Sequence, residues 1–202
     1  MGGLKTILKM AFIVLLAFLL LRSCENRKSY PTQPSQAIQL EPIQKSPSKK
    51  TFAFKGYTIT PLADFEITAK ILSREKYYLG EESDISPIDL VLGWGRMADD
   101  NVLKTISISQ SNRWYYWETK ELPIPQREIE THSANMHMIP QDDRLKSVLL
   151  NAKKGDIVNI KGALVRVDKG DNWHWQSSLS RDDTGDGACE VIFVESANIE
   201  HL

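Results

Sequence analysis

Residues 156–168 read DIVNIKGALVRVD, and this stretch decides the fold. Apolar Ile, Val, Ala and Leu side chains recur along it, with polar residues between them. Such a pattern over thirteen residues predicts one long strand. Gly162 interrupts the run, and a glycine inside a strand marks a bulge or a bend. We therefore expect a long strand that bends at Gly162.

A helix is expected directly before this strand, over residues 141–153. Leu145, Val148 and Leu149 stand at helical spacing, acidic residues occupy the first turn, and Gly155 follows as a stop signal. The helix followed by KKGDIVNIKGALVRVD resembles the core of small barrels of the oligomer-binding (OB) type. In those barrels a glycine lets one long strand curl around the barrel.

The rest of the domain also has the pattern of strands. In DFEITAKIL, residues 64–72, Phe65, Ile67, Ala69 and Ile71 share one face. Further extended segments are expected at 88–92, 106–109, 114–118, 173–179 and 190–195, with a helical turn at 97–105. The fold class that follows is α+β: a mostly antiparallel, curved β-sheet or a small OB-like barrel with one or two helices.

The first 24 residues have the character of a membrane anchor. Residues 10–21 read MAFIVLLAFLLL, and the apolar stretch reaches 18 residues, 4–21, when the flanking lysines extend to the headgroups. We expect an uncleaved signal-anchor or transmembrane helix. A cleaved secretory signal is one alternative. Another is a bacterial lipoprotein lipidated at Cys24, because residues 21–24, LRSC, resemble a lipobox, from which Arg22 departs.

Three segments are therefore expected. Residues 1–24 form the anchor, residues 25–51 form a linker rich in Pro, Ser and Gln, and residues 52–202 form a β-rich globular domain. The order basic, apolar, polar at the amino terminus is that of a secretion signal. We expect a domain outside the cytoplasm, in the bacterial periplasm, tethered to the membrane.

Charge narrows the range of partners. The chain has 25 basic and 26 acidic residues and a net charge of −1, so no basic excess is available to neutralise phosphates, and no nucleic-acid partner is expected. The two cysteines, Cys24 and Cys189, are too few for a disulfide framework.

Two segments contain metal-ligand residue types. His132 and His137 lie in THSANMH, and histidine is a common zinc ligand. Asp182 and Asp186 lie in RDDTGDGACE, residues 181–190, which matches the opening of a D-x-[DN]-x-[DN]-G calcium loop except for Thr184 at the third position. Its end, DGACE, also resembles the short Excalibur calcium-binding motif. The candidate metal ligands, for calcium or zinc, are His132, His137, Asp182, Asp186 and Glu190; a polar loop without a metal is the alternative.

Aromatic residues supply a second kind of candidate site. Five tryptophans are present, and Trp173 and Trp175 share one face of an expected strand. Such rings stack on sugars or on peptide side chains, or pack within the core. The candidate ligand-binding residues are Trp114, Trp173, Trp175, Asp182 and Asp186.

A binding role follows more readily than a catalytic one, because the sequence has no G-x-S-x-G nucleophile motif. We expect a membrane-anchored cell-envelope protein whose domain binds a protein partner or an envelope ligand. The alternative is a metal-dependent envelope enzyme that uses His132, His137 and the acidic loop 182–190.

Overall fold

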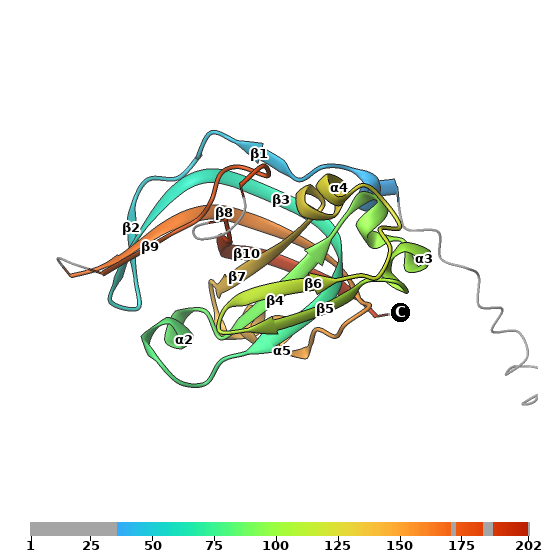
Figure 1. The fold of residues 1–202 in the computed structure, drawn as a ribbon. Coiled ribbons are helices and arrows are strands. Elements are labelled where there is room, and N and C mark those ends of the chain that lie inside the picture. The colour runs from blue at the N-terminus through green and yellow to red at the C-terminus, as the bar shows by residue number, and fades with distance from the viewer. Residues whose placement is uncertain (1–35, 171–172, 184–187, 202) are drawn as a thin grey trace, which may run out of the picture. The chain divides into compact units, whose positions relative to one another are not determined.

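The structure is a computed structural model that describes residues 36–170, 173–183 and 188–201. The expected anchor, residues 1–24 with Cys24, and Asp186 lie outside these ranges. Among the described residues no helix is both long enough and apolar enough to cross a membrane. The described chain consists mostly of strands in one curled sheet, with few helices (Figure 1). The expected α+β class with a curved sheet is confirmed at this level.

Five strands pair in a ring. The order is β3 (Tyr57–Lys76), β4 (Ile88–Gly93), β7 (Ser133–Pro140), β10 (Glu190–Glu200) and β8 (Ile157–Lys169), and β8 pairs again with β3. All of these pairs are antiparallel except β7 with β10, which are parallel. The short strands β1 (Ile43–Lys45), β2 (Phe52–Phe54) and β9 (Trp173–Gln176) extend the sheet. The sheet is therefore barrel-like, without a free edge on its five main strands.

The ring closes because β3 is long and curved. It pairs with β8 over residues 58–70 and with β4 over residues 70–76. Its register shifts between Pro61 and Ala63 and again between Ile71 and Ser73. Such irregularities bend a strand and increase its twist. Figure 1 shows β3 and β8 as the two long, curved strands of the domain.

At Gly162 the backbones of β8 and β10 approach each other closely. Gly162 lies between Phe65 of β3 and Val194 of β10. A Cβ atom at this position would collide with the carbonyl oxygen of Phe193, so the close approach requires glycine. The register shift lies in the partner strand, between Val194 and Ser196, rather than in β8 itself. The irregularity expected at Gly162 is therefore a bulge in the partner strand β10.

The interior of the ring is apolar. The face predicted from residues 64–72 is confirmed, because Phe65, Ile67, Ala69 and Ile71 all belong to the main core cluster. Helix α5 (Asp143–Asn151) follows β7 and adds Leu149 to this cluster, so it covers the end of the barrel where β7 terminates. The side chain of Asp142 caps the helix by accepting a hydrogen bond from the backbone N of Leu145 at 2.7 Å.

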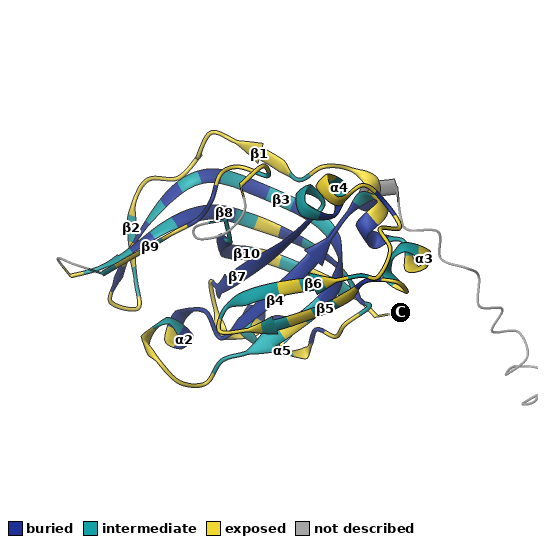
Figure 2. Cartoon of the chain, viewed as in Figure 1, coloured by how far each residue is buried: buried dark blue, intermediate teal, exposed yellow. Residues whose placement is uncertain are grey.

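Strand β7 was not expected from the sequence. All eight of its residues are buried, and Figure 2 shows β4 and β7 as buried strands. Ala134, Met136 and Met138 point into the core cluster. The residues between them, which include Asn135 and His137, therefore face outward. The hairpin of β5 (Ser107–Ser111) and β6 (Trp114–Glu118) and strand β9 lie over this outer face, as the contacts below show.

Short helices complete the domain. They are η1 (Gln36–Gln39), α2 (Glu81–Ile85), η2 (Gly95–Ala98), α3 (Asp100–Leu103) and α4 (Gln126–Thr131). The first of them lies within the range expected to be linker, as does β1. Ile38 is buried there, and β1 pairs with β3. The packed part of the chain therefore begins before residue 52.

Candidate functional site

A cavity of about 310 Å³ lies at the end of the barrel opposite α5. The parallel strands β7 and β10 begin at this end, and β4 terminates there at Gly93, which precedes Trp94. The lining comes from Trp94, from α4 and the start of β7 (Glu130, Thr131, Ser133, Ala134, Asn135), from β6 (Trp114, Tyr115, Trp117) and from the segment before β10 (Ser180, Arg181, Asp183, Ala188, Cys189, Glu190). Four elements distant in sequence thus meet around one cavity.

A buried ion pair forms part of the cavity wall. Nη1 of Arg181 pairs with Oε1 of Glu190, whose side chain is only 2% exposed. Oε2 of Glu190 and Nη2 of Arg181 are buried and have no hydrogen-bond partner among the described residues. Buried polar atoms are nearly always paired, so an unpaired acceptor and an unpaired donor together are exceptional. Both residues contribute to the lining of the cavity.

Burial has the largest effect on the pKa of Glu190. Removal from water disfavours the carboxylate and raises its pKa to about 8, although the charge of Arg181 acts in the opposite direction. Asp183 adds to the increase through like-charge repulsion. Glu190 can therefore gain or lose a proton near neutral pH, which is a property common at functional sites.

The aromatic wall is fixed to the barrel by the β5–β6 hairpin. The hydroxyl of Tyr115 lies 3.3 Å from Oγ of Ser133 on β7. Nε2 of Gln110 donates to Oδ1 of Asn135 at 2.9 Å, and Nδ2 of Asn135 donates to the carbonyl oxygen of Arg113 at 2.7 Å. These contacts hold the hairpin in one position over β7, so the rings of the wall are in place before any ligand arrives.

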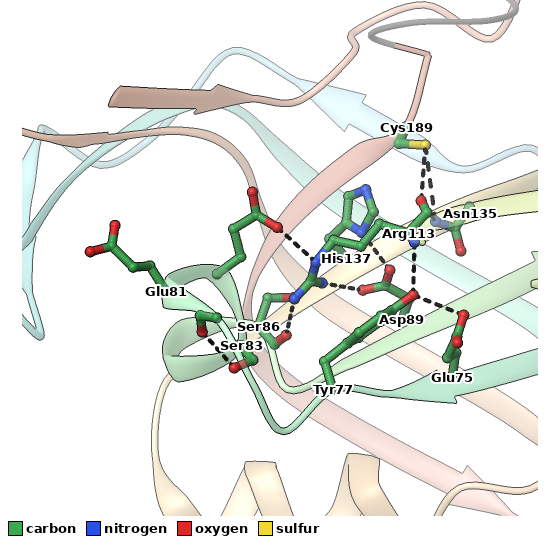
Figure 3. Close-up of polar contacts among 12 residues, drawn as sticks. Glu75, Tyr77, Glu81, Ser83, Ser86, Asp89, Arg113, Asn135, His137 and Cys189 are labelled. Atoms are coloured by element: carbon green, nitrogen blue, oxygen red, sulfur yellow. Dashed lines mark hydrogen bonds and ion pairs between the residues drawn. The ribbon is translucent and has the colours of Figure 1, made fainter. Parts of the chain in front are cut away.

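Arg113 is the centre of a buried network beside the cavity (Figure 3). It occupies the hairpin turn with a positive φ of 66°. Its guanidinium donates to Oδ1 of Asp89 at 2.9 Å and to the carbonyl oxygen of Ser86 at 3.0 Å, and pairs with Glu82 at 3.0 Å. It also stacks on the ring of Tyr77 at 4.0 Å. Four groups, from β4 and from the segment between β3 and β4, therefore hold one arginine of the hairpin.

His137 belongs to the same network. Its Nδ1 lies 2.8 Å from Oδ2 of Asp89, and both side chains are buried. The imidazole ring faces Trp175 of β9 with ring centroids 4.6 Å apart. The guanidinium of Arg113 lies 5.2 Å from the same indole. These contacts connect β4, β7, β9 and the hairpin. The side chains of Arg113, His137 and Trp175 pack in the protein interior and do not line the cavity.

Cys189 lies between the network and the cavity. Its Sγ is 4.0 Å from the carbonyl oxygen of Arg113 and from Nδ2 of Asn135 (Figure 3). Burial and the neighbouring carboxylates raise its pKa to about 11. The thiol is therefore protonated at neutral pH and is a poor nucleophile.

The structure gives each described residue of the expected metal set a separate partner. His132 pairs with Glu41 and His137 with Asp89, at 2.9 and 2.8 Å. His132 lies at the C-terminal end of α4, whereas His137 lies within β7. Asp182 pairs with Arg127 of α4, and Glu190 with Arg181. Among the described residues no group of three His, Cys, Asp or Glu side chains could hold a metal ion.

The structure also does not bring the expected ligand-binding residues together at one site. Trp114 lines the cavity. Trp175 covers His137, and Trp173 packs edge-on against Tyr57 with ring centroids 5.8 Å apart, both outside the cavity lining. Asp182 is exposed and contacts Arg127 at the rim. Of the two candidate sets, the cavity thus contains Trp114 and Glu190.

Several lining residues were not expected from the sequence, among them Ser133 and Asn135. Asn135 lies in a segment whose alternating Ser, Asn and His conceal a strand. Arg181 adjoins a run of serines whose hydroxyls shape the backbone before β10: Oγ of Ser178 accepts from the backbone N of Ser180 at 2.9 Å. The sequence feature that could have indicated this part of the cavity wall is WQSSLSR, residues 175–181, in which polar residues follow an aromatic strand.

Comparisons of the chain with protein-family models, with curated proteins and with solved structures gave no match.

Proposed function

We propose that this chain is a membrane-anchored binding module of the bacterial cell envelope, and that its domain holds an envelope ligand in the cavity at the barrel mouth. The buried pair of Arg181 and Glu190 carries the proposal. It forms part of the wall of a space of about 310 Å³ that is also bordered by aromatic rings. Ligand pockets commonly combine apolar walls with a few polar groups of this kind.

The barrel is OB-like in the proposal. Its strand order, in which β3 pairs with both β4 and β8 while β7 and β10 are parallel, together with a helix between β7 and β8, supports that assignment. OB barrels bind ligands on the face of their second and third strands and with the adjoining loops. Here those strands are β4 and β7, and the cavity is lined by Trp94 after β4, by the start of β7, by the hairpin and by the segment before β10.

The membrane tether rests on the sequence of residues 1–51. An apolar segment followed by a linker rich in proline would hold the domain near the bilayer on its outer side. A metal-dependent enzyme, the alternative, gains no support from the described histidines, because Glu41 and Asp89 engage them separately.

The full-length protein in detergent provides the test. A water-soluble extract of bacterial envelope should raise the midpoint of thermal unfolding, because a ligand that binds only the native state stabilises it. Trp114→Ala should abolish the increase, whereas Tyr116→Ala should preserve it, since Tyr116 is 52% exposed and does not line the cavity. Equal increases in the wild type and Trp114→Ala, or no increase in either, would refute the cavity as the site.

A further inference from the structure

We infer that the cavity at the barrel mouth binds a methylated ammonium group, carried by a small organic cation such as choline. This inference rests on the proposed function and adds the chemical class of the ligand. Three properties of the lining support it: the charge of its open side chains, the direction in which Arg181 points, and the aromatic rings.

The side chains that bring charge to the open part of the cavity are acidic. Glu130 of α4 is partly exposed and Asp183 is exposed, and both line the cavity. Their hydrogen-bond donors are neutral: Nε2 of Gln126 donates to Oε1 of Glu130 at 2.8 Å, and Oγ of Ser178 donates to Oδ2 of Asp183. Neutral donors leave the two negative charges in place, so this part of the lining attracts a cation and repels an anion.

Arg181 is turned away from the open part of the cavity. Both terminal nitrogens of its guanidinium are buried, and Nη1 pairs with Glu190. The guanidinium lies 5.9 Å from the ring centroid of Phe65, a residue of the barrel core. Glu190 is itself buried and mostly protonated at neutral pH, so neither member of this pair is needed to contact the ligand. The two open carboxylates outweigh the single charge of Arg181, and no lysine or histidine occurs in the part of the lining that the structure describes.

The negative potential also reaches the walls of the cavity. Burial is the largest cause of the raised pKa values of Tyr115, Cys189 and Glu190, and carboxylates of the lining add to each increase. Glu130 acts on Tyr115, and Asp183 acts on Cys189 and on Glu190. Walls that resist the formation of a further negative charge favour a positive one between them.

The aromatic rings select the kind of cation. Trp94, Trp114, Tyr115 and Trp117 line the cavity, and the electron-rich faces of such rings attract a cation. A methylated ammonium group suits this lining, because its methyl groups pack on the rings and it has no N–H groups that need acceptors. A primary ammonium group has three donors and is strongly hydrated, so it gives up more on leaving water.

The size and composition of the cavity agree with a small organic cation. Its volume of about 310 Å³ is at the small end of ligand pockets, which span about 300–1,000 Å³. A metal ion is a poorer occupant, since among the described residues no group of three His, Cys, Asp or Glu side chains could hold one.

The test is a calorimetric titration of the full-length protein in an uncharged maltoside detergent. The probes are choline, its neutral isostere 3,3-dimethylbutan-1-ol, and ethanolamine, which has a primary ammonium group. We expect saturable binding of choline and binding of the other two that is weaker by about tenfold or more, because the isostere lacks the charge and ethanolamine is strongly hydrated. The absence of saturable choline binding, or equal affinity for the neutral isostere, would overturn the inference.

Variants of the lining locate the site. Asp183→Asn and Glu130→Gln each remove one open charge and should weaken choline binding about threefold, whereas Glu118→Gln, exposed and outside this lining, should bind like the wild type. Trp114→Ala should weaken binding by about tenfold or more, and Tyr116→Ala should leave it unchanged. Neither carboxylate is buried, so a double variant of Asp183 and Glu130 tests the site without disturbing the core. Wild-type affinity in that double variant would contradict a cation site.

Phosphocholine distinguishes two sources of the methylated ammonium group. It carries this group beside a phosphate, as a lipid headgroup does, and the open carboxylates should make it bind more weakly than choline if the ligand is a free cation. Tighter binding of phosphocholine would identify the headgroup instead, and either result supports the inference. If choline does not bind but the envelope extract still stabilises the wild type and not Trp114→Ala, only the cation is refuted. If that stabilisation is also absent, the proposed function falls as well.

Discussion

Nη1 of Arg113 donates to Oδ1 of Asp89 at 2.9 Å, and the second carboxylate oxygen of Asp89 lies 2.8 Å from His137. Asp89 has no exposed side-chain surface. An arginine at a hairpin turn thus neutralises a carboxylate on the outer face of the barrel. The contact fixes the hairpin that carries Trp114, Tyr115 and Trp117, and so it connects the stability of the domain to the shape of the cavity.

Removal of Arg113 should therefore be costly. Arg113→Ala leaves Asp89 buried without its main cation, and breaking a buried pair on one side costs about 3–5 kcal/mol. Urea unfolding of the full-length protein measures this loss. Lys161→Ala is the control, because its ion pair with Glu66 is exposed and should contribute about 1 kcal/mol or less. Equal effects of the two substitutions would show that the network does not hold the hairpin.

Glu190 should make stability fall as pH rises. Its folded-state pKa of about 8 exceeds its ordinary value of 4.5, so between these values the folded protein binds the proton that the unfolded chain has lost. The stabilisation is complete below about pH 4.5 and is lost progressively up to about pH 8. Thermal melts across this range should show a falling midpoint for the wild type and a smaller decrease for Glu190→Gln. The exposed carboxylate of Glu118 is the control, and Glu118→Gln should follow the wild type.

Gly162 should not tolerate a side chain. Gly162→Ala drives a methyl group into the backbone of Phe193, and overpacking of this kind costs about 3 kcal/mol. Ser196→Ala, at an exposed position beside the same bulge, should unfold at nearly the wild-type urea concentration. A Gly162→Ala protein as stable as the wild type would mean that β8 and β10 can separate at this point.

Cys24 decides between two kinds of anchor. If the chain is a lipoprotein, a fatty-acid analogue supplied to growing bacteria should label the wild type, and Cys24→Ala should lose the label. Equal labelling of both proteins, or of neither, would rule out lipidation at Cys24 and favour the signal-anchor.

The sequence predicted the parts of the fold in which local pattern and tertiary role agree. Alternation in residues 64–72 indicated one face of β3, and the spacing of Leu145 and Leu149 indicated α5. Strand β7 could not be recognised, because it is buried on both faces and its outward face carries Ser133, Asn135 and His137, which pair with groups distant in the sequence. Burial by a hairpin far along the chain has no local signature.

The candidate site was predictable only in part for the same reason. Trp114 and Glu190 could be selected by residue type, but their meeting depends on the closure of the barrel. The two histidines five residues apart suggested a shared metal, whereas His132 at the end of α4 pairs with Glu41 and His137 within β7 pairs with Asp89. Residue types indicated the chemistry, and topology determined which of them share a space.

Photo-crosslinking at the cavity tests the central claim most directly. A photoreactive amino acid replaces Trp114 in one full-length protein and Tyr116 in another, and bacterial cells that express each protein are irradiated. The account predicts a light-dependent adduct with an envelope component at position 114 and none at position 116, because only the first side chain lines the cavity. Adducts of equal yield at both positions, or an adduct at position 116 alone, would contradict a ligand site at the barrel mouth.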